Sequence, residues 1–501
     1  MRQPVTVLIR AVASFAAVTL ATVAPLAGCG GTSSKGALTL DGGDGGQGGF
    51  GDGGARDGRA SSSDATRRDG GQADACLTLT CGQIACPVGG AGGGPASLSG
   101  TVYDPAGKVP LYNVIVYIPT TPVKPITTGA TCDQCGGEVT GNPLVSTLTD
   151  ATGHFVLPNV PMGTPIPLVL QVGKWRRQIT IPAVTTCGDT PLTDKNLLRL
   201  PKNHTEGDIP RIALSTGGAD PLECLLRKIG IEDAEFMTAG GTGRVHLYAG
   251  SGVPTEMPAP LVAANKFAST LNGGMSFADS QTLWSSLTNL SAYDVLLLAC
   301  EGEQNPNTKP PAALQAMASF ESQGGRVFAS HWHDYWFANG PAPLPSAGAW
   351  TDVTPPPPDP SDGTIDTSFP KGKALHDWLA NVSGLDSTGS LPIKEPKHNV
   401  NSVGPGAQQW ITLQNPNTTP AGQTAVEYMT FNMPLDVDAG TQCGRVVYSD
   451  LHVASGDQTG QPFPSGCITT DLSPQEKALE FMLFDLSSCI QSDTQPPQPP
   501  K

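Results

Sequence analysis

The chain has 501 residues, which is enough for two or three domains, and its hydrophobic content of 38% allows buried cores. Its 60 glycines and 47 prolines indicate long linkers and loop-rich β structure. The formal net charge of -15 argues against nucleic-acid binding and against electrostatic docking on anionic lipid. We therefore expect no nucleic-acid partner.

The chain begins with a short basic stretch and an apolar run from Ala11 to Leu26, which ends in Leu26-Ala27-Gly28-Cys29. A plain secretory signal needs only small residues at its cleavage site. This ending resembles the lipobox of bacterial lipoprotein precursors. The resemblance implies a signal peptide over residues 1–28 and an acylated Cys29 that anchors the protein to a membrane of the cell envelope, with the outer membrane favoured. The alternative is an ordinary signal peptide that contains a cysteine.

Residues 29–95 are expected to be a tether that begins at the lipidated cysteine. Most of this range is rich in Gly, Ser, Asp and Arg and has almost no large apolar residues, so it cannot bury a core and should be disordered. A cysteine cluster at its end, Cys76, Cys81 and Cys86, is expected to staple the tether to the first domain. Zinc binding there is less favoured because no histidine lies nearby.

The 12 cysteines predict disulfides, because an exported protein meets an oxidising compartment. Setting the lipidated cysteine aside leaves an odd number, hence a free thiol or an intermolecular bond. Cys132 and Cys135 have CxxC spacing, which also suits a redox pair or half a zinc site; without a second CxxC or a helix N-terminus, disulfide bonding is favoured. The expected disulfide cysteines are Cys76, Cys81, Cys86, Cys132, Cys135, Cys187, Cys224, Cys443, Cys467 and Cys489, and Cys300 is the candidate free thiol.

Residues 96–200 alternate short strands with turns. Strand-like segments at 98–103 and 111–118 flank an Asp-Pro-Ala-Gly turn, and further strands are expected within 146–157 and over 167–172. Short strands at such intervals indicate a β-sandwich.

The recurring positions of these segments resemble those of the carboxypeptidase regulatory-like domain, a transthyretin-like sandwich. The matching positions are Gly100, Val102, Thr149, Asp150, Gly153, Phe155, Leu157, Asn159, Pro161 and Gly163. A cysteine-bearing insertion around 131–137 departs from that pattern. The resemblance implies a transthyretin-like fold in an accessory module for surface display or binding.

Residues 201–242 are expected to be a connector with one helix. Asp220 and Glu223 have the spacing of a capping box at its start, and Leu222, Leu225 and Leu226 supply an apolar stripe for packing. Residues 491–501 form a polar, Pro-rich tail.

Residues 243–490 alternate apolar strands with helices, which predicts a Rossmann-like, three-layer α/β domain with a parallel sheet. The expected strands are 244–249, 293–299, 326–331 and 445–450, and the expected helices are 280–290, 310–323 and 477–486. Ser473 and Glu476 form a capping box before the last helix. Residues 355–358 and much of 391–425 are expected to be long loops.

The strand–helix–strand run from Tyr293 to His331, which ends in GGRVFASH, resembles class I glutamine-amidotransferase-like folds, particularly the trehalose-utilisation-like branch. In the amidotransferases, a cysteine in the elbow after such a strand is the nucleophile. Here the elbow reads Ser330-His331-Trp332-His333, so that cysteine is absent and amidotransferase chemistry is not implied. The whole-chain pattern also resembles myxobacterial-type envelope lipoproteins, which implies no activity.

Histidine and aspartate residues follow two of the predicted strands. If these strands are parallel neighbours, the side chains meet at one edge of the sheet, and imidazole with carboxylate suits zinc or a similar divalent ion. The candidate metal or ligand residues are His331, His333, Asp334, Asp450 and His452. The alternative is satisfied polar packing beneath an aromatic cluster.

Trp332 and Trp336, in that aromatic cluster, are candidates for stacking against a sugar. Cys300 ends an earlier strand, and the acidic Glu301 and Glu303 beside it would raise its pKa, so we interpret it as structural.

Three functions are therefore open. The favoured one is a non-catalytic binding or surface-display lipoprotein whose partner is a carbohydrate or another envelope component, such as a protein. The second is a metal-assisted hydrolase with a zinc cofactor at the His/Asp cluster, and the third is a structural envelope protein.

Overall fold

The computed structural model of the protein describes residues 79–84, 86, 94–251, 262–453, 456–468 and 470–499. The predicted signal peptide, Cys29, most of the tether and Cys76 lie outside these residues. The described residues belong to one compact unit that is rich in β structure. Within them, no helix is long and apolar enough to cross a membrane.

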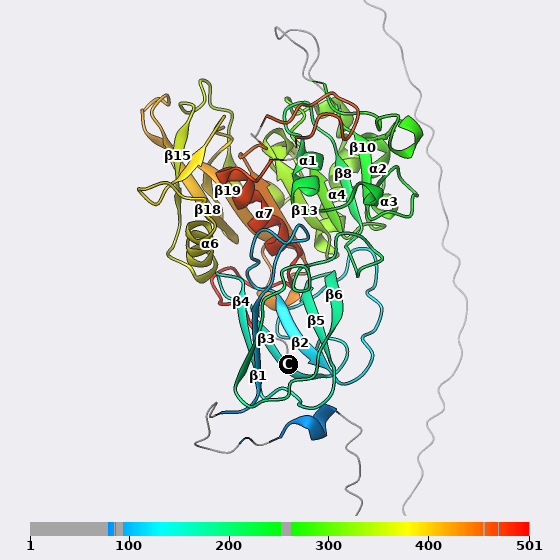
Figure 1. The fold of residues 1–501 in the computed structure, drawn as a ribbon. Coiled ribbons are helices and arrows are strands. Elements are labelled where there is room, and N and C mark those ends of the chain that lie inside the picture. The colour runs from blue at the N-terminus through cyan, green and yellow to red at the C-terminus, as the bar shows by residue number, and fades with distance from the viewer. Residues whose placement is uncertain are drawn as a thin grey trace, which may run out of the picture. The chain divides into compact units, whose positions relative to one another are not determined.

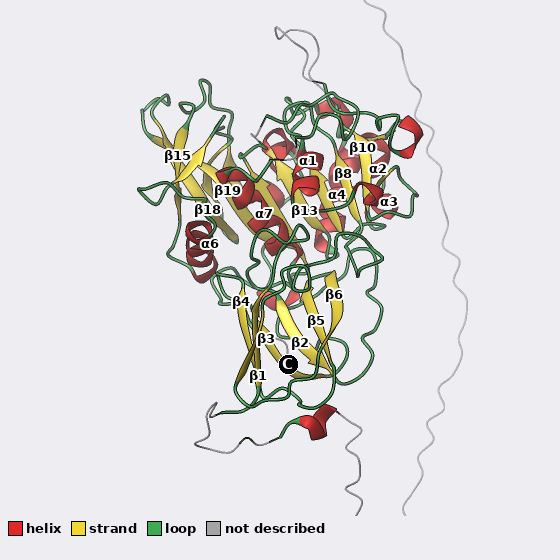
Figure 2. Ribbon diagram, in the orientation of Figure 1, coloured by secondary structure: helices red, strands yellow, loops and turns green. Residues whose placement is uncertain are grey.

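The first folded part is a sandwich of two sheets (Figure 2). One sheet has the order β3-β2-β5-β6 and the other the order β4-β1-β7, and side chains from both sheets share one core. The strands are β1 (Ser97–Thr101), β2 (Ile115–Pro119), β3 (Pro143–Leu148), β4 (His154–Pro158), β5 (Ile166–Val172), β6 (Trp175–Ile181) and β7 (Asp189–Leu192). The expected strands are present, and β6 and β7 were not predicted.

The second part is built on one large mixed sheet in the order β11-β10-β8-β12-β13-β20-β19-β18-β15-β16, with β9 paired to β10 (Figure 1). Pairing is parallel from β11 to β20 and antiparallel from β20 to β16. The strands are β8 (Ile212–Ser215), β9 (Phe236–Met237), β10 (Val245–Ala249), β11 (Ala278–Asp279), β12 (Val295–Leu298), β13 (Arg326–Ser330), β15 (Ser361–Ile365), β16 (Leu391–Ile393), β18 (Ala407–Asn415), β19 (Gln423–Met433) and β20 (Gly444–Ser449). A separate hairpin pairs β14 (Gly348–Trp350) with β17 (Val400–Val403).

Helices cover both faces of the parallel half. Alternate residues of a strand point to opposite faces, so Leu297 packs in the core cluster that contains α1 and α7, and Leu296 packs in the cluster that contains α2 and α4. The helices are α1 (Leu222–Lys228), α2 (Ser280–Trp284), α3 (Leu287–Leu290), α4 (Pro311–Ser322), α5 (Tyr335–Ala338), α6 (Pro370–Asn381) and α7 (Pro474–Ser487).

Several expectations from the sequence were wrong. Much of the range 391–425 was expected to be loop, but it supplies β16, β17, β18 and the start of β19. In β18, Gln and Thr on the less buried positions hide the alternation that marks a strand. The range 201–242, expected to be a connector, supplies β8, which lies between β10 and β12. The expected tail is partly packed, since Asp493 is buried against Arg445.

Four disulfides join segments that are distant in sequence: Cys86–Cys187, Cys132–Cys443, Cys135–Cys489 and Cys224–Cys467. Cys81 is also disulfide-bonded. Cys132 and Cys135 therefore pair with distant cysteines and not with each other. Two of these bonds fasten the 131–137 loop of the sandwich to the second part of the chain.

Candidate functional site

A cavity of about 530 Å³ lies at the carboxyl ends of the parallel strands; we refer to it as the sheet-edge cavity. One wall is formed by residues in the loops after β8, β12, β13 and β20, namely Gly218, Ala219, Gly302, His331, Trp332, His452 and Val453. The opposite wall comes from the segments 352–356, 395–399 and 456–459. In open α/β sheets, this edge is where ligands bind.

The order of the strands brings the two histidine-bearing ends together. β13 pairs with β20 in parallel register, so Ser330 lies opposite Ser449 and the residues after them emerge side by side. Asp220 was expected to cap α1, but it makes no cap hydrogen bond there. Its carboxylate instead accepts hydrogen bonds from Ser330 Oγ at 2.7 Å and from the backbone N–H of Val453 at 2.9 Å. Asp220 thus ties together the two chain segments that carry the histidines.

A cluster of three buried side chains lies at this wall. Cys300 Sγ is 3.4 Å from His331 Nδ1, and the ring centroids of His331 and His452 are 5.2 Å apart. One ligand atom from each of the three residues lies within 4.8 Å of the other two. His331, the first residue after β13, has a backbone φ of 42°, in the left-handed region that costs energy for a non-glycine residue.

Burial keeps all three side chains uncharged near neutral pH. Burial, with the neighbouring charges of His452 and Lys397, holds the pKa of His331 well below its usual range. Burial likewise lowers the pKa of His452 to about 3. Burial raises the pKa of the Cys300 thiol to about 12, although the backbone N–H groups of Trp332 and Gly302 oppose that shift. The two imidazoles therefore keep free lone pairs, and the thiol is protonated.

Three of the five predicted site residues are held by other protein groups and do not line the cavity. His333 Nε2 lies 3.0 Å from the Ala299 carbonyl oxygen, and Trp336 Nε1–H donates to His333 Nδ1 at 3.0 Å. Asp334 accepts hydrogen bonds from the Gln304 side-chain amide at 3.1 and 3.2 Å.

Asp450 accepts a hydrogen bond from the Asn399 backbone N–H at 2.9 Å and lies 2.7 Å from the Tyr448 hydroxyl. Burial raises the pKa of Asp334 to about 8, helped by the nearby charge of Asp450. Burial also raises the pKa of Asp450 to about 7. These carboxyl groups form a polar layer behind the cavity wall.

The two tryptophans have different roles. Trp332 is half-buried, lines the cavity and lies against His331 with ring centroids 4.6 Å apart. Trp336 is 1% exposed and packs edge-on against Trp284 in the core, with centroids 5.2 Å apart. The prediction of Trp336 as a stacking residue is therefore wrong, because no ligand can reach it.

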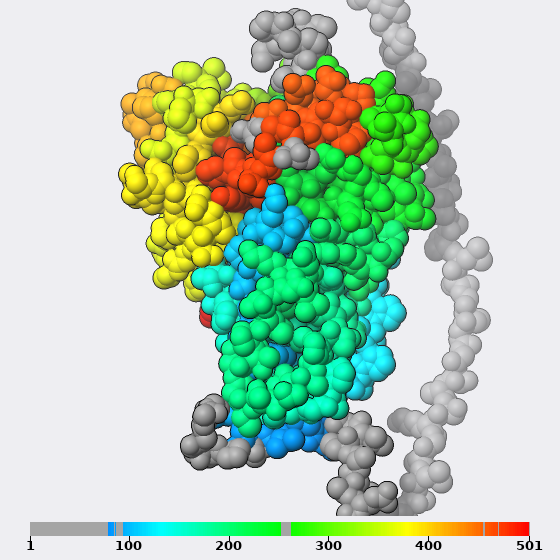
Figure 3. Space-filling view, in the orientation of Figure 1, coloured from blue at the N-terminus to red at the C-terminus, as the bar shows by residue number. Residues whose placement is uncertain are grey.

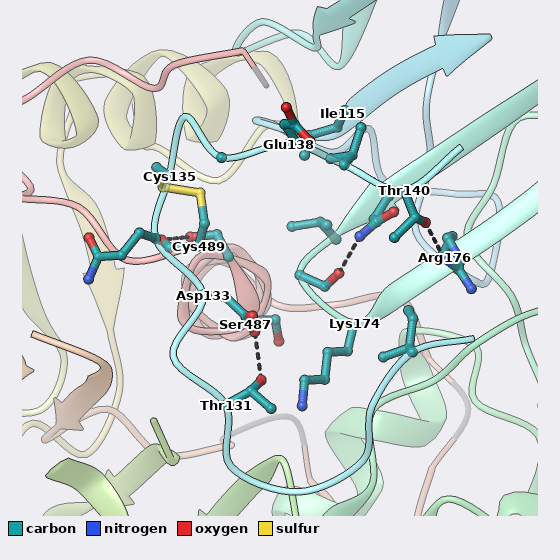
Figure 4. A pocket seen from close by; sticks show the side chains of 18 of the residues that line it. Ile115, Thr131, Asp133, Cys135, Glu138, Thr140, Lys174, Arg176, Ser487 and Cys489 are labelled. Carbon is teal, nitrogen blue, oxygen red and sulfur yellow. Dashed lines mark hydrogen bonds between the residues drawn. A yellow bond between two sulfur atoms is a disulfide. The ribbon is translucent and has the colours of Figure 1, made fainter. Parts of the chain in front are cut away.

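A second cavity, of about 510 Å³, lies where the sandwich meets the second part of the chain (Figure 4). Its wall includes the Cys135–Cys489 disulfide and the basic residues Lys174 and Arg176. Both bases are already paired with protein acids, Lys174 with Asp294 at 2.6 Å and Arg176 with Asp208 at 2.8 Å. The sheet-edge cavity is lined by His452, whose ring nitrogens have no hydrogen-bond partner among the described residues, so we treat this cavity as the candidate site.

No protein-family model matches the chain, and no curated protein matches it. The solved structures that match include two crystal structures of type II cohesin–X-dockerin complexes from Acetivibrio cellulolyticus, an N-terminal and a C-terminal interface mutant. Their sequence identities are 16% and 15% and their TM-scores 0.15 and 0.14, and each covers 29% of this chain and 78% of its own. Likeness at these TM-scores carries no argument about fold or function.

The sequence did not single out Cys300 as a partner of the histidines. The sequence shows that Cys300 follows an apolar strand, but it does not show that β12 and β13 are neighbours in the sheet. The parallel pairing of Leu298 with Ala329 supplies that information and places Cys300 beside His331.

Proposed function

We propose that the protein is an envelope lipoprotein, anchored through Cys29, that binds a ligand in the sheet-edge cavity. The observation that carries the binding role is the cavity itself, about 530 Å³ at the carboxyl ends of parallel strands, with an accessible aromatic ring in its wall. A cavity of this size suits a small molecule or a few sugar units. A purely structural envelope role, the third possibility, gives no reason for such a cavity.

Carbohydrate is the ligand class that the cavity wall favours. Trp332 offers an aromatic face in a cavity that is also lined by the accessible charged side chains of Lys397, Asp352 and Glu395. Sugars combine apolar C–H faces with hydroxyl groups, so an aromatic ring next to hydrogen-bonding side chains matches their chemistry. An envelope protein with an exposed sugar or a loop of similar polarity is the alternative partner.

Glycan-array binding of the full chain tests this proposal, with Trp332→Ala and Trp332→Phe as a matched pair. We expect the alanine variant to lose affinity by about tenfold or more, equal to about 1.4 kcal/mol, and the phenylalanine variant to keep most of it. Absence of glycan binding, or equal binding by the alanine variant, would contradict the carbohydrate proposal.

The membrane anchor is a separate part of the proposal and rests on the sequence from Leu26 to Cys29. We expect the wild-type chain to incorporate a radiolabelled fatty acid and to fractionate with the outer membrane. A Cys29→Ala variant should lose the label. Label retained in that variant, or a wild-type chain without label, would contradict the anchor.

We also propose that the second part is a Rossmann-like domain related to the amidotransferase-like folds. The parallel strands supply support, because their spatial order β11-β10-β8-β12-β13-β20 corresponds to 3-2-1-4-5-6 in chain order when β9, which lies off this path, is set aside. This is a doubly wound arrangement. The elbow after β13 reads Ser330-His331-Trp332-His333 and contains no cysteine. The proposed relationship is therefore one of fold without amidotransferase chemistry.

A metal-assisted hydrolase is the second candidate function, favoured by the two neighbouring imidazoles of His331 and His452 at the cavity wall. A bound zinc ion would supply an activated water. Turnover of chromogenic ester, phosphate or glycoside substrates that stops with a chelator and returns with Zn²⁺ would support it. Binding of a glycan without any turnover would leave the non-catalytic role.

A further inference from the structure

We propose that Cys300, His331 and His452 form a three-ligand site for a transition-metal ion of the zinc class. The three residues come from the ends of β12, β13 and β20, which the sheet places next to one another. Their ligand atoms gather within 4.8 Å. This inference uses the same cavity as the proposed binding function, but metal loading can be measured without knowing the cavity's ligand.

The separation of Cys300 and His331 suits tetrahedral coordination. Zinc–sulfur and zinc–nitrogen bonds of about 2.3 and 2.05 Å at a tetrahedral angle place the sulfur and nitrogen atoms roughly 3.6 Å apart. Cys300 Sγ and His331 Nδ1 are 3.4 Å apart. The thiol and this imidazole nitrogen are therefore already close to the separation that a shared ion imposes.

His452 gives an independent indication of a ligand. Its ring is 2% exposed, and neither Nδ1 nor Nε2 has a hydrogen-bond partner among the described residues. Burial of an unpartnered polar group costs free energy, and native structures rarely leave both nitrogens of an imidazole unpaired. A metal ion bound by one of these nitrogens would offset that cost.

Cys300 also stands apart from the other cysteines. It is the one free cysteine in the described part of the chain, where the other cysteines form disulfides. His331, whose ring lies beside this thiol, has a left-handed backbone, and functional sites commonly carry the energetic cost of such a conformation.

One thiolate and two imidazoles select zinc, copper and related ions over magnesium or calcium, which prefer oxygen ligands. Binding requires the thiolate, so the Cys300 proton leaves to solvent as the sulfur–metal bond forms. His331 and His452 line the sheet-edge cavity, and Cys300 lies fully buried behind them. A fourth coordination position would therefore face the cavity, where water or a ligand can occupy it.

The test loads the purified full chain with Zn²⁺, removes loosely bound metal by dialysis and measures metal per chain by elemental mass spectrometry. Co²⁺ replaces Zn²⁺ in a parallel sample, because a cobalt–thiolate bond gives a near-ultraviolet charge-transfer band. We expect one ion per chain and that band. Cys300→Ser should lose the band, and His452→Ala should lower affinity more than 100-fold, beyond the 10–100-fold effect of outer-shell partners.

His376→Ala is the matched control, because His376 lies on the exposed side of α6, away from the cavity. It should keep both the metal and the cobalt band. Circular dichroism checks that each variant is folded. If Cys300→Ser does not fold, the cobalt spectrum of the wild type and the metal affinity of His452→Ala decide the test. Absence of stoichiometric metal in the wild-type chain, or a cobalt spectrum without a thiolate band, would overturn the proposal.

Discussion

Glu321, in the last turn of α4, is a buried carboxyl group that should make the free energy of unfolding depend on pH. Its side chain is fully buried, and neither carboxyl oxygen has a hydrogen-bond partner among the described residues. Burial alone raises the pKa of Glu321 from an ordinary value of 4.5 to about 8. The group is therefore protonated in the folded protein at neutral pH and ionised in the unfolded chain.

The sign of the pH dependence follows from this difference. Between pH 4.5 and pH 8 the folded state holds a proton that the unfolded state has lost, so the free energy of unfolding falls as pH rises. One proton corresponds to about 1.4 kcal/mol per pH unit. Over the 2.5 units between the unfolded pKa and pH 7, the loss is on the order of 3 kcal/mol.

Glu321→Gln removes this titration and keeps the shape of the neutral side chain. We expect the variant to be more stable than the wild type at pH 7, by up to about 3 kcal/mol, and nearly equal at pH 4.5. Urea unfolding followed by fluorescence, with the disulfides intact, measures the difference at pH 5, 6, 7 and 8. The control is Glu303→Gln at an exposed position. Parallel curves for wild type and Glu321→Gln across this range would refute the reasoning.

Three further outcomes are expected. Burial would raise the pKa of Asp493, but the charges of Arg445 and Lys371 lower it to about 2, so the free energy of unfolding should fall as the pH drops from about 4 to 2. Asp493→Asn should remove this acid dependence and lower the free energy of unfolding at pH 7 by about 3 kcal/mol. An Asp493→Asn variant with the same acid unfolding as the wild type would contradict this prediction. A Cβ at Gly217 would lie 2.1 Å from a backbone oxygen that follows β12, so Gly217→Ala should lower the melting temperature, unlike Gly440→Ala, whose Cβ meets open space. Peptide mapping without reduction should find the 131–137 loop linked to two C-terminal peptides.

Local signals in the sequence predicted local structure well. The capping box of Ser473 and Glu476 is present at the start of α7, because all of its atoms lie within one turn of the chain. Asp220 carried a similar signal, yet tertiary contacts with Ser330 and Val453 took its carboxylate. A capping pattern in the sequence predicts one hydrogen bond for the side chain, and only the folded structure shows whether a tertiary hydrogen bond replaces it.

Only part of the candidate site could be predicted from the sequence, again because local signals do not give tertiary contacts. His331 and His452 follow strand-like segments, and the expectation that these strands are parallel neighbours is confirmed. His333 and Asp334 follow β13 as well, but the short helical turn 331–334 rotates them away from the cavity. Strand ends can be read from apolar runs, whereas the direction of the next side chain depends on the turn that follows.

The walls of the sheet-edge cavity are fixed by links between distant segments. Cys224 in α1 is disulfide-bonded to Cys467, and Lys228 of the same helix pairs with Asp457, which lines the cavity. The segment that contains Asp457 and Cys467 is the orange-red surface beside the green segments in Figure 3, and its Phe463 pairs with a residue that follows β10.

These links are covalent and ionic, so the shape of the cavity depends on an oxidising compartment in which the Cys224–Cys467 bond can form. Cys300 keeps its thiol in the same surroundings because it is fully buried and its pKa is raised to about 12 by that burial, which suppresses the reactive thiolate. The Cys224–Cys467 disulfide thus helps to fix the wall of the cavity, and Cys300 keeps a reduced sulfur behind it. A wall held in place by such links is the support that a preorganised binding site needs.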